Sequence, residues 1–240
     1  MEYLLGEFFG TLVLIVLGCG VVANMCLSKS KGHGGGWICI STGWGFAIVF
    51  GVFTATTLHA QGDLNPAVTL AKNIAGIYTF GEFAMITLAQ LLGAFVGAVI
   101  VWAVYIAHWA ETDDKAEKLA VFATGPAIRN ISGCFIAETV ATFFLMFLVW
   151  MIFSKEVGTI PPGLGPYVVG VLIWSLVISL GGITGCAINP ARDLGPRIAH
   201  AILPIPGKGS SDWGYAWVPI VGPCLGAVLA YFVAVACGVF

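Results

Sequence analysis

The stretch "GDLNPAVTLA" at residues 62–71 places an Asn followed by a helix-breaking Pro within an apolar part of the chain, and the pair returns in "GCAINPARDL" at residues 185–194. Pro is favoured at the first position of a helix, where its missing N–H is not needed, and Asn is a preferred N-cap. Each pair therefore predicts the start of a short helix, capped by Asn65 or Asn189.

Composition excludes most classes of protein. Hydrophobic residues make up 59% of the 240 residues and charged residues 9%, whereas soluble domains average about 25% charged residues. The net charge of −2 gives no indication of a nucleic-acid partner. The seven cysteines lack the spacing of a disulfide framework or a zinc site. We expect a membrane protein that is not an enzyme and needs no cofactor or metal.

A membrane-spanning helix needs about 20 mostly apolar residues, because every backbone polar group in hydrocarbon must be paired within the segment. Six stretches are predicted as spans: roughly residues 3–27, 37–58, 82–107, 131–153, 166–182 and 216–239. The mixed-charge stretch at 111–118 is predicted to be a solvated loop.

The two Asn-Pro stretches, about 65–75 and 189–200, are too short to cross. About 11 residues of helix reach only some 17 Å, roughly half of a hydrocarbon core. They are either surface loops or half-helices that dip into the membrane from opposite sides.

An internal repeat favours half-helices. "GEFFGTLVLIVLG" resembles "AETVATFFLMFLV" and aligns Glu7 with Glu138, and the Asn-Pro-Ala triplets follow in the same order. The chain is thus a single domain of two repeats, approximately 1–110 and 130–240, joined by a loop at 111–129. Each repeat holds three spans, an odd number, so the second repeat is inverted and the short segments approach each other from opposite faces.

Two half-helix N-termini that meet at the midplane would combine positive dipole ends with two Asn side chains. The non-helical residues before them must be buried or line water. Those predicted to line a pore with their backbone are Gln61, Gly62, Asp63, Thr184 and Gly185. Carbonyl and Asn groups would replace the hydrogen bonds of a neutral solute, while the positive midplane opposes cations and hydronium. This combination predicts a selective passive pore.

The doubled box resembles that of the aquaporin and aquaglyceroporin family over essentially the whole chain. Its residues are Asn65, Pro66, Ala67, Asn189, Pro190 and Ala191. The resemblance implies an all-α membrane protein with six transmembrane helices and two re-entrant half-helices in two inverted repeats. It also implies a homotetramer with one pore in each subunit.

Within that family, "NPARD" at 189–193 resembles the glycerol-facilitator branch, for which Asp193 is the marker. The resemblance implies a selectivity filter at four positions: Trp44, Val177, Cys186 and Arg192. Trp44 matches the glycerol branch, whereas Val177 stands where that branch commonly has Gly and the water branch His. Cys186 stands where the glycerol branch commonly has a second aromatic residue, and in this it resembles the water branch.

The function expected from these positions is a passive channel for glycerol and other small neutral solutes, together with water, that excludes ions and protons. The filter leaves open a water-selective pore, or a facilitator of undissociated lactic acid or dihydroxyacetone. Inverted repeats with broken helices also build ion-coupled secondary transporters, and a structural membrane protein without transport is a further alternative.

Three acidic residues need an explanation in an apolar chain. Glu7 and Glu138 resemble the family's internal braces, which accept hydrogen bonds from the half-helix loops, rather than proton-coupling groups. Asp63 stands where the family usually has His. It is either stabilised by the half-helix dipole, the interpretation that we favour, or faces the pore and favours cations.

Localisation also follows from the resemblance, which implies a multi-pass cell-membrane protein with both termini in the cytoplasm. The short termini favour a microbial source. The distribution of Lys and Arg favours the opposite orientation, because cytoplasmic termini leave only Lys72 and Lys155 in the inner loops. We retain the orientation of the family.

Overall fold

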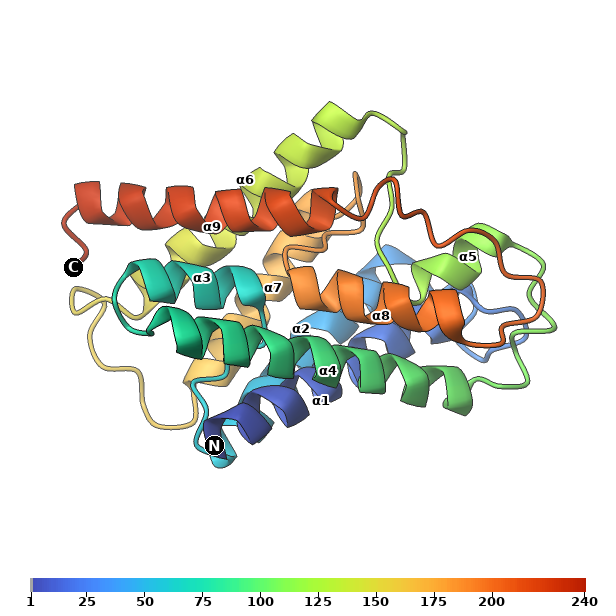
Figure 1. The fold of residues 1–240 in the computed structure, drawn as a ribbon, viewed down its shortest axis with the longest axis horizontal. Helices are drawn as coiled ribbons and strands as arrows, with labels where there is room; N and C mark the ends of the chain where they lie inside the picture. The colour runs from blue at the N-terminus through green and yellow to red at the C-terminus, as the bar shows by residue number, and fades with distance from the viewer. Residues whose placement is uncertain (1) are drawn as a thin grey trace.

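The computed structural model describes residues 2–240, and these residues form nine α-helices and no strand (Figure 1). The helices are α1 Glu2–Cys26, α2 Gly36–Thr57, α3 Pro66–Ile74, α4 Phe80–Val104, α5 Lys115–Ala120, α6 Ile131–Ile152, α7 Gly165–Leu180, α8 Pro190–Ile202 and α9 Val218–Ala236. The order of two long helices, one short helix and a third long helix occurs twice, in α1–α4 and in α6–α9.

Each predicted span overlaps one of the six longer helices. Of the helices described, α1, α2, α4, α6 and α9 are long and apolar enough to cross a membrane. Helix α7 is apolar but has only 16 residues, which gives it a length of about 24 Å. Both ends of the chain lie toward the left of Figure 1.

Glycines bring the long helices close together at matching places in the two halves. A Cβ atom on Gly93 of α4 would lie 2.2 Å from the carbonyl oxygen of Phe8 in α1. A Cβ atom on Gly226 of α9 would lie 2.2 Å from that of Thr139 in α6. Only glycine fits at either contact, so both helix pairs use the small-residue packing that is common in membranes.

The short helices α3 and α8 lie end to end inside the bundle (Figure 1). They begin at Pro66 and Pro190, with Asn65 and Asn189 as N-caps. The Asn65 carboxamide oxygen accepts the N–H of Ala67 at 2.9 Å, as the Asn189 oxygen accepts that of Ala191 at 3.0 Å. The caps and first residues are buried. The two stretches are therefore interior half-helices and not surface loops.

The prediction of a solvated loop at 111–118 is wrong for part of that stretch. Asp114 caps the short helix α5, its side chain accepting the N–H of Ala116 at 2.7 Å. The Lys118 side chain is buried and donates to the carbonyl of Pro206. The loop between α8 and α9 covers α5, so this ammonium group has a backbone acceptor in place of water.

Candidate channel and selectivity filter

The half-helix junction is held by two reciprocal hydrogen bonds. The Asn65 amide nitrogen donates to the carbonyl of Ile188 at 2.8 Å, and the Asn189 amide nitrogen donates to the carbonyl of Leu64 at 2.7 Å. A carboxamide carries two N–H hydrogens. One from each Asn therefore joins the halves, and the other is available to a solute.

A cavity of about 480 Å³ lies against this junction, and its lining includes Asn65 and Asn189. Trp44, Ile48, Val52 and Thr56 of α2 also line it. These residues are four apart and share one helix face, so the cavity follows α2 for about 18 Å. It is an elongated space and not a compact pocket.

All four residues predicted as the filter line this cavity. The Arg192 guanidinium carbon lies 4.1 Å from the centroid of the Trp44 ring, and its Nη1 donates to the carbonyl of Phe122 at 3.2 Å. Trp44, Val177, Cys186 and Arg192 are buried. A guanidinium fixed on an aromatic face supplies a positive charge and hydrogen-bond donors at the lining.

The predicted backbone lining divides into two groups. Gln61, Gly62 and Asp63 line the cavity, whereas Thr184 and Gly185 are not among its lining residues. The Thr184 carbonyl accepts the N–H of Gly125 at 3.1 Å, and the Gly185 N–H donates to the carbonyl of Gly181 at 2.8 Å. These backbone groups are occupied within the protein, and the next residues in the chain form the lining instead.

Glu7 and Glu138 bind the two half-helix loops in the same manner. The Glu7 carboxylate accepts the N–H groups of Asp63 at 2.9 Å and Leu64 at 2.8 Å. The Glu138 carboxylate accepts those of Ala187 at 2.9 Å and Ile188 at 2.8 Å.

These loops have strained backbone next to the cavity. Leu64 and Ile188 have φ angles of 52° and 45°, and Cys186 has a φ angle of 53°. Such left-handed conformations are unfavourable for residues with a side chain, above all for a β-branched one such as Ile. The carboxylates of Glu7 and Glu138 hold the strained loops through their backbone N–H groups.

A comparison of the sequence with family models matches residues 1–234 to the major intrinsic protein family. The chain belongs to the major intrinsic protein family. The predicted fold class and the predicted resemblance are thereby confirmed, and the chain is a membrane protein.

Two relatives and one solved structure illustrate the match. The chain is 50% identical over 229 residues to a probable glycerol uptake facilitator protein of Thermotoga maritima, covering 95% of this chain and 96% of that one. It is 50% identical over 226 residues to glycerol uptake facilitator protein 3 of Lactiplantibacillus plantarum, covering 94% and 92%. Its structure resembles that of the aquaglyceroporin from Plasmodium falciparum with a TM-score of 0.88 and 31% identity, covering 99% of this chain and 97% of that one.

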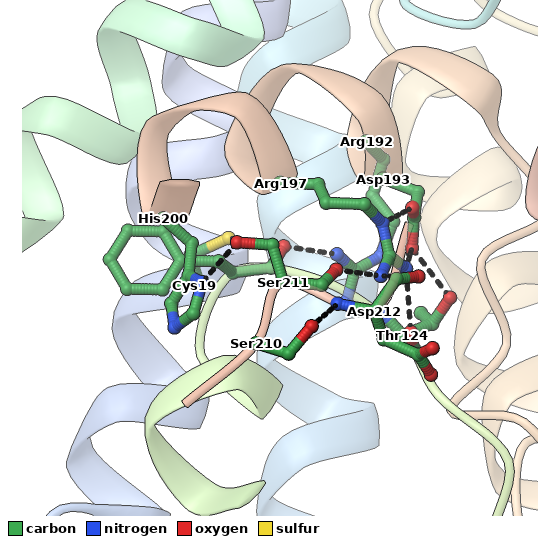
Figure 2. Close-up of polar contacts among 10 residues, drawn as sticks. Cys19, Thr124, Arg192, Asp193, Arg197, His200, Ser210, Ser211 and Asp212 are labelled. Atoms are coloured by element: carbon green, nitrogen blue, oxygen red, sulfur yellow. Dashed lines mark hydrogen bonds and ion pairs between the residues drawn. The ribbon is translucent and has the colours of Figure 1, made fainter. Parts of the chain in front are cut away.

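In this major intrinsic protein Asp193, which the resemblance predicts to mark the glycerol branch, lies in a buried network with Arg197 (Figure 2). Its carboxylate accepts the N–H and hydroxyl of Thr124 at 2.8 and 2.6 Å and pairs with Arg197 Nε at 2.8 Å. Arg197 also donates to the carbonyls of Thr124 and Ser211, at 2.8 and 2.7 Å. The network joins α8 to two loops, one of which carries the Phe122 carbonyl that holds Arg192.

Several residues of this site were not predicted from the sequence. Arg197 could have been found from its i, i+4 spacing to Asp193 on a helix. Gln90 could have been found as a polar residue in a span; it donates to Glu7 at 2.8 Å and to Thr69 at 3.0 Å. No simple spacing signal pointed to Lys72, which pairs with Asp63.

Proposed function

We propose that the chain is a passive membrane channel for glycerol and other small neutral solutes, together with water. The observation that carries the proposal is the composition of the cavity wall. Asn65, Asn189 and Arg192 supply hydrogen-bond donors, whereas Ile48 and Val149 are among the apolar residues of the lining. A polyol with hydroxyls on one side and carbon on the other suits such a wall, because its hydrogen bonds to water are replaced where donors are present.

Exclusion of cations and hydronium follows from positive groups beside the same cavity. The N-terminal ends of α3 and α8 meet beside the cavity, and each carries a partial positive charge of about half an elementary charge. Arg192 adds a full charge at the filter. A cation would lose its hydration shell in a region that repels positive charge. A neutral solute would not be repelled there.

The printed names of the relatives, glycerol uptake facilitators, support the choice of glycerol over water alone. The filter leaves room for glycerol, since Cys186 opens one corner relative to the aromatic residue common in the glycerol branch, while Val177 fills part of another corner relative to Gly. The same space would admit undissociated lactic acid or dihydroxyacetone, which we retain as candidate solutes.

We also infer that residues 1–110 and 130–240 are inverted repeats, from the matching Glu braces and glycine contacts of the two halves. By family resemblance we propose a homotetramer in the bacterial plasma membrane with both termini in the cytoplasm. Light scattering coupled to size-exclusion chromatography tests the tetramer. Protease accessibility of terminal tags in sealed cells tests the orientation.

Purified protein in lipid vesicles provides the test of function. Stopped-flow light scattering should show permeabilities to water and to glycerol well above those of empty vesicles. A glycerol permeability equal to that of empty vesicles would contradict the proposal. Water permeability without glycerol permeability would favour the water-selective alternative, and a lactic acid gradient in the same vesicles tests that solute.

A further inference from the structure

Asp63, two residues before the first half-helix, is part of a buried ion pair. Its side chain is 0% exposed, and its carboxylate pairs with Lys72 Nζ. The same carboxylate accepts the hydroxyl of Thr69 at 3.0 Å. The sequence left two roles open for this acid, and the structure turns its side chain into the protein, toward Thr69 and Lys72.

Lys72 lies in the last turn of α3 and lines the cavity together with Gln61 and Asp63. Its Nζ donates to Gln61 Oε1 at 3.0 Å, and its side chain is 15% exposed. The ammonium group thus bridges the loop before the half-helix to the far end of that half-helix. It is also close enough to the cavity for its charge to act on what enters.

Without Lys72, the recorded partners of the Glu7 and Asp63 carboxylates would all be neutral. Glu7 accepts hydrogen bonds from two backbone N–H groups and from Gln90, and Gln90 in turn contacts Thr69. Among these recorded partners of the two carboxylates, Lys72 is the cation.

The second half-helix loop has no counterpart to this pair. The residue two positions before Asn189 is Ala187, so the second loop has no carboxylate at the position that corresponds to Asp63. Of the two half-helix loops, the one before α3 therefore carries the ion pair, with a buried carboxylate behind the lining.

We propose that Lys72 is a specificity-determining residue that neutralises Asp63 and so prevents the α3 end of the channel from admitting cations. The inference rests on the proposed channel function and deepens it. Arg192 and the half-helix ends oppose cations at the filter and the junction, whereas Lys72 acts at the end where a buried carboxylate would attract them.

Removal of the ammonium charge gives a distinct expectation. An unpaired carboxylate in a low-dielectric cleft concentrates counter-ions by a factor of about 10 or more. We therefore expect Lys72→Met to raise the ratio of potassium permeability to glycerol permeability by about 10-fold over that of the wild type. The double variant Asp63→Asn/Lys72→Met has no charge to expose and should return to the wild-type potassium level.

The test uses the full chain in lipid vesicles that contain a potassium-sensitive dye, with glycerol permeability measured on the same preparation. Lys155→Met is the matched control, since Lys155 is exposed and lies two residues after Phe153, which lines the same cavity. If Lys72→Met does not assemble, Lys72→Gln decides in its place, because its amide still donates hydrogen bonds but carries no charge.

Wild-type potassium entry in both Lys72→Met and Lys72→Gln would overturn the inference. So would a potassium leak that persists in the double variant, because the effect would then be structural and not due to charge. Glycerol flux of the wild type tests the proposed function separately. A wild type that does not conduct glycerol, with variants that leak potassium, would refute the glycerol channel and retain the role of Lys72.

Discussion

Replacement of Glu138 by Ala removes the acceptor that holds the second half-helix loop. In the wild type this carboxylate accepts the N–H groups of Ala187 and Ile188 and the hydroxyl of Thr184, at 2.9, 2.8 and 2.6 Å. The hydroxyl can rotate to another acceptor, whereas the two buried N–H groups cannot. Each orphaned group costs about 1–3 kcal/mol, so the variant should lose about 2–6 kcal/mol.

The loss should also affect conduction. Ile188 is held at a φ angle of 45°, a conformation that costs about 1–3 kcal/mol and persists only where the surroundings impose it. Without the carboxylate the loop relaxes, and the carbonyl of Ile188 moves away from Asn65. We expect lower glycerol permeability in vesicles as well as a lower unfolding temperature in detergent.

Glu156→Ala is the control for this experiment, because Glu156 is exposed and its removal should change stability by less than about 0.5 kcal/mol. Thermal unfolding of the three proteins is measured under one detergent condition. If Glu138→Ala unfolds at the wild-type temperature and conducts glycerol at the wild-type rate, Glu138 is not a brace.

Three further predictions concern the filter, the helix contacts and the loop between α8 and α9. Cys186→Phe should reduce the permeability of glycerol more than that of water, because the ring fills part of the cavity; an unchanged ratio in stopped-flow measurements would show that this position does not set the size limit. Gly226→Ala should lower the free energy of unfolding by about 1–3 kcal/mol through overpacking, as measured by thermal unfolding. Gly20→Ala, with no atom within 4 Å of the new Cβ, should leave stability nearly unchanged. Equal effects of the two substitutions would contradict the close contact at Gly226. A hydrogen bond from Arg129 lowers the pKa of Asp212. The stability that this pair contributes is therefore present above the ordinary pKa of the carboxyl group and is lost as the pH falls through the lowered pKa. Asp212→Asn should unfold at a lower temperature at neutral pH and lose less stability on acidification, and a loss equal to that of the wild type would contradict the role of the pair.

The helical framework could be predicted from the sequence because the bilayer imposes a length on every span. The two half-helices were predictable for a local reason, since Asn-Pro is both a cap and a first turn. Glu7 and Glu138 became candidates because an acid is costly inside a span. The start of each short helix and the choice of the two acids followed from single stretches of chain, whereas the placement of the short helices inside the membrane followed from the internal repeat.

The partners of charged residues were harder to predict. Lys118 stands in a mixed-charge stretch that is typical of a solvated loop, and its burial depends on the α8–α9 loop that covers it. The pairing of Asp63 with Lys72 depends on how the loop at 61–64 contacts the last turn of α3. Thr184 was expected to line the pore, but a backbone N–H from Gly125 in a distant loop occupies its carbonyl. These contacts arise from tertiary structure that sequence spacing does not encode.

We propose that solute passes through the cavity beside Asn65 and Asn189 without coupling to an ion. The deciding measurement is the rate of glycerol entry into vesicles over a wide range of glycerol gradients, with and without ionophores. A passive channel predicts a rate that rises linearly with the gradient and is indifferent to ionophores. A rate that saturates and collapses when the ion gradients are dissipated would contradict the claim and indicate a coupled transporter.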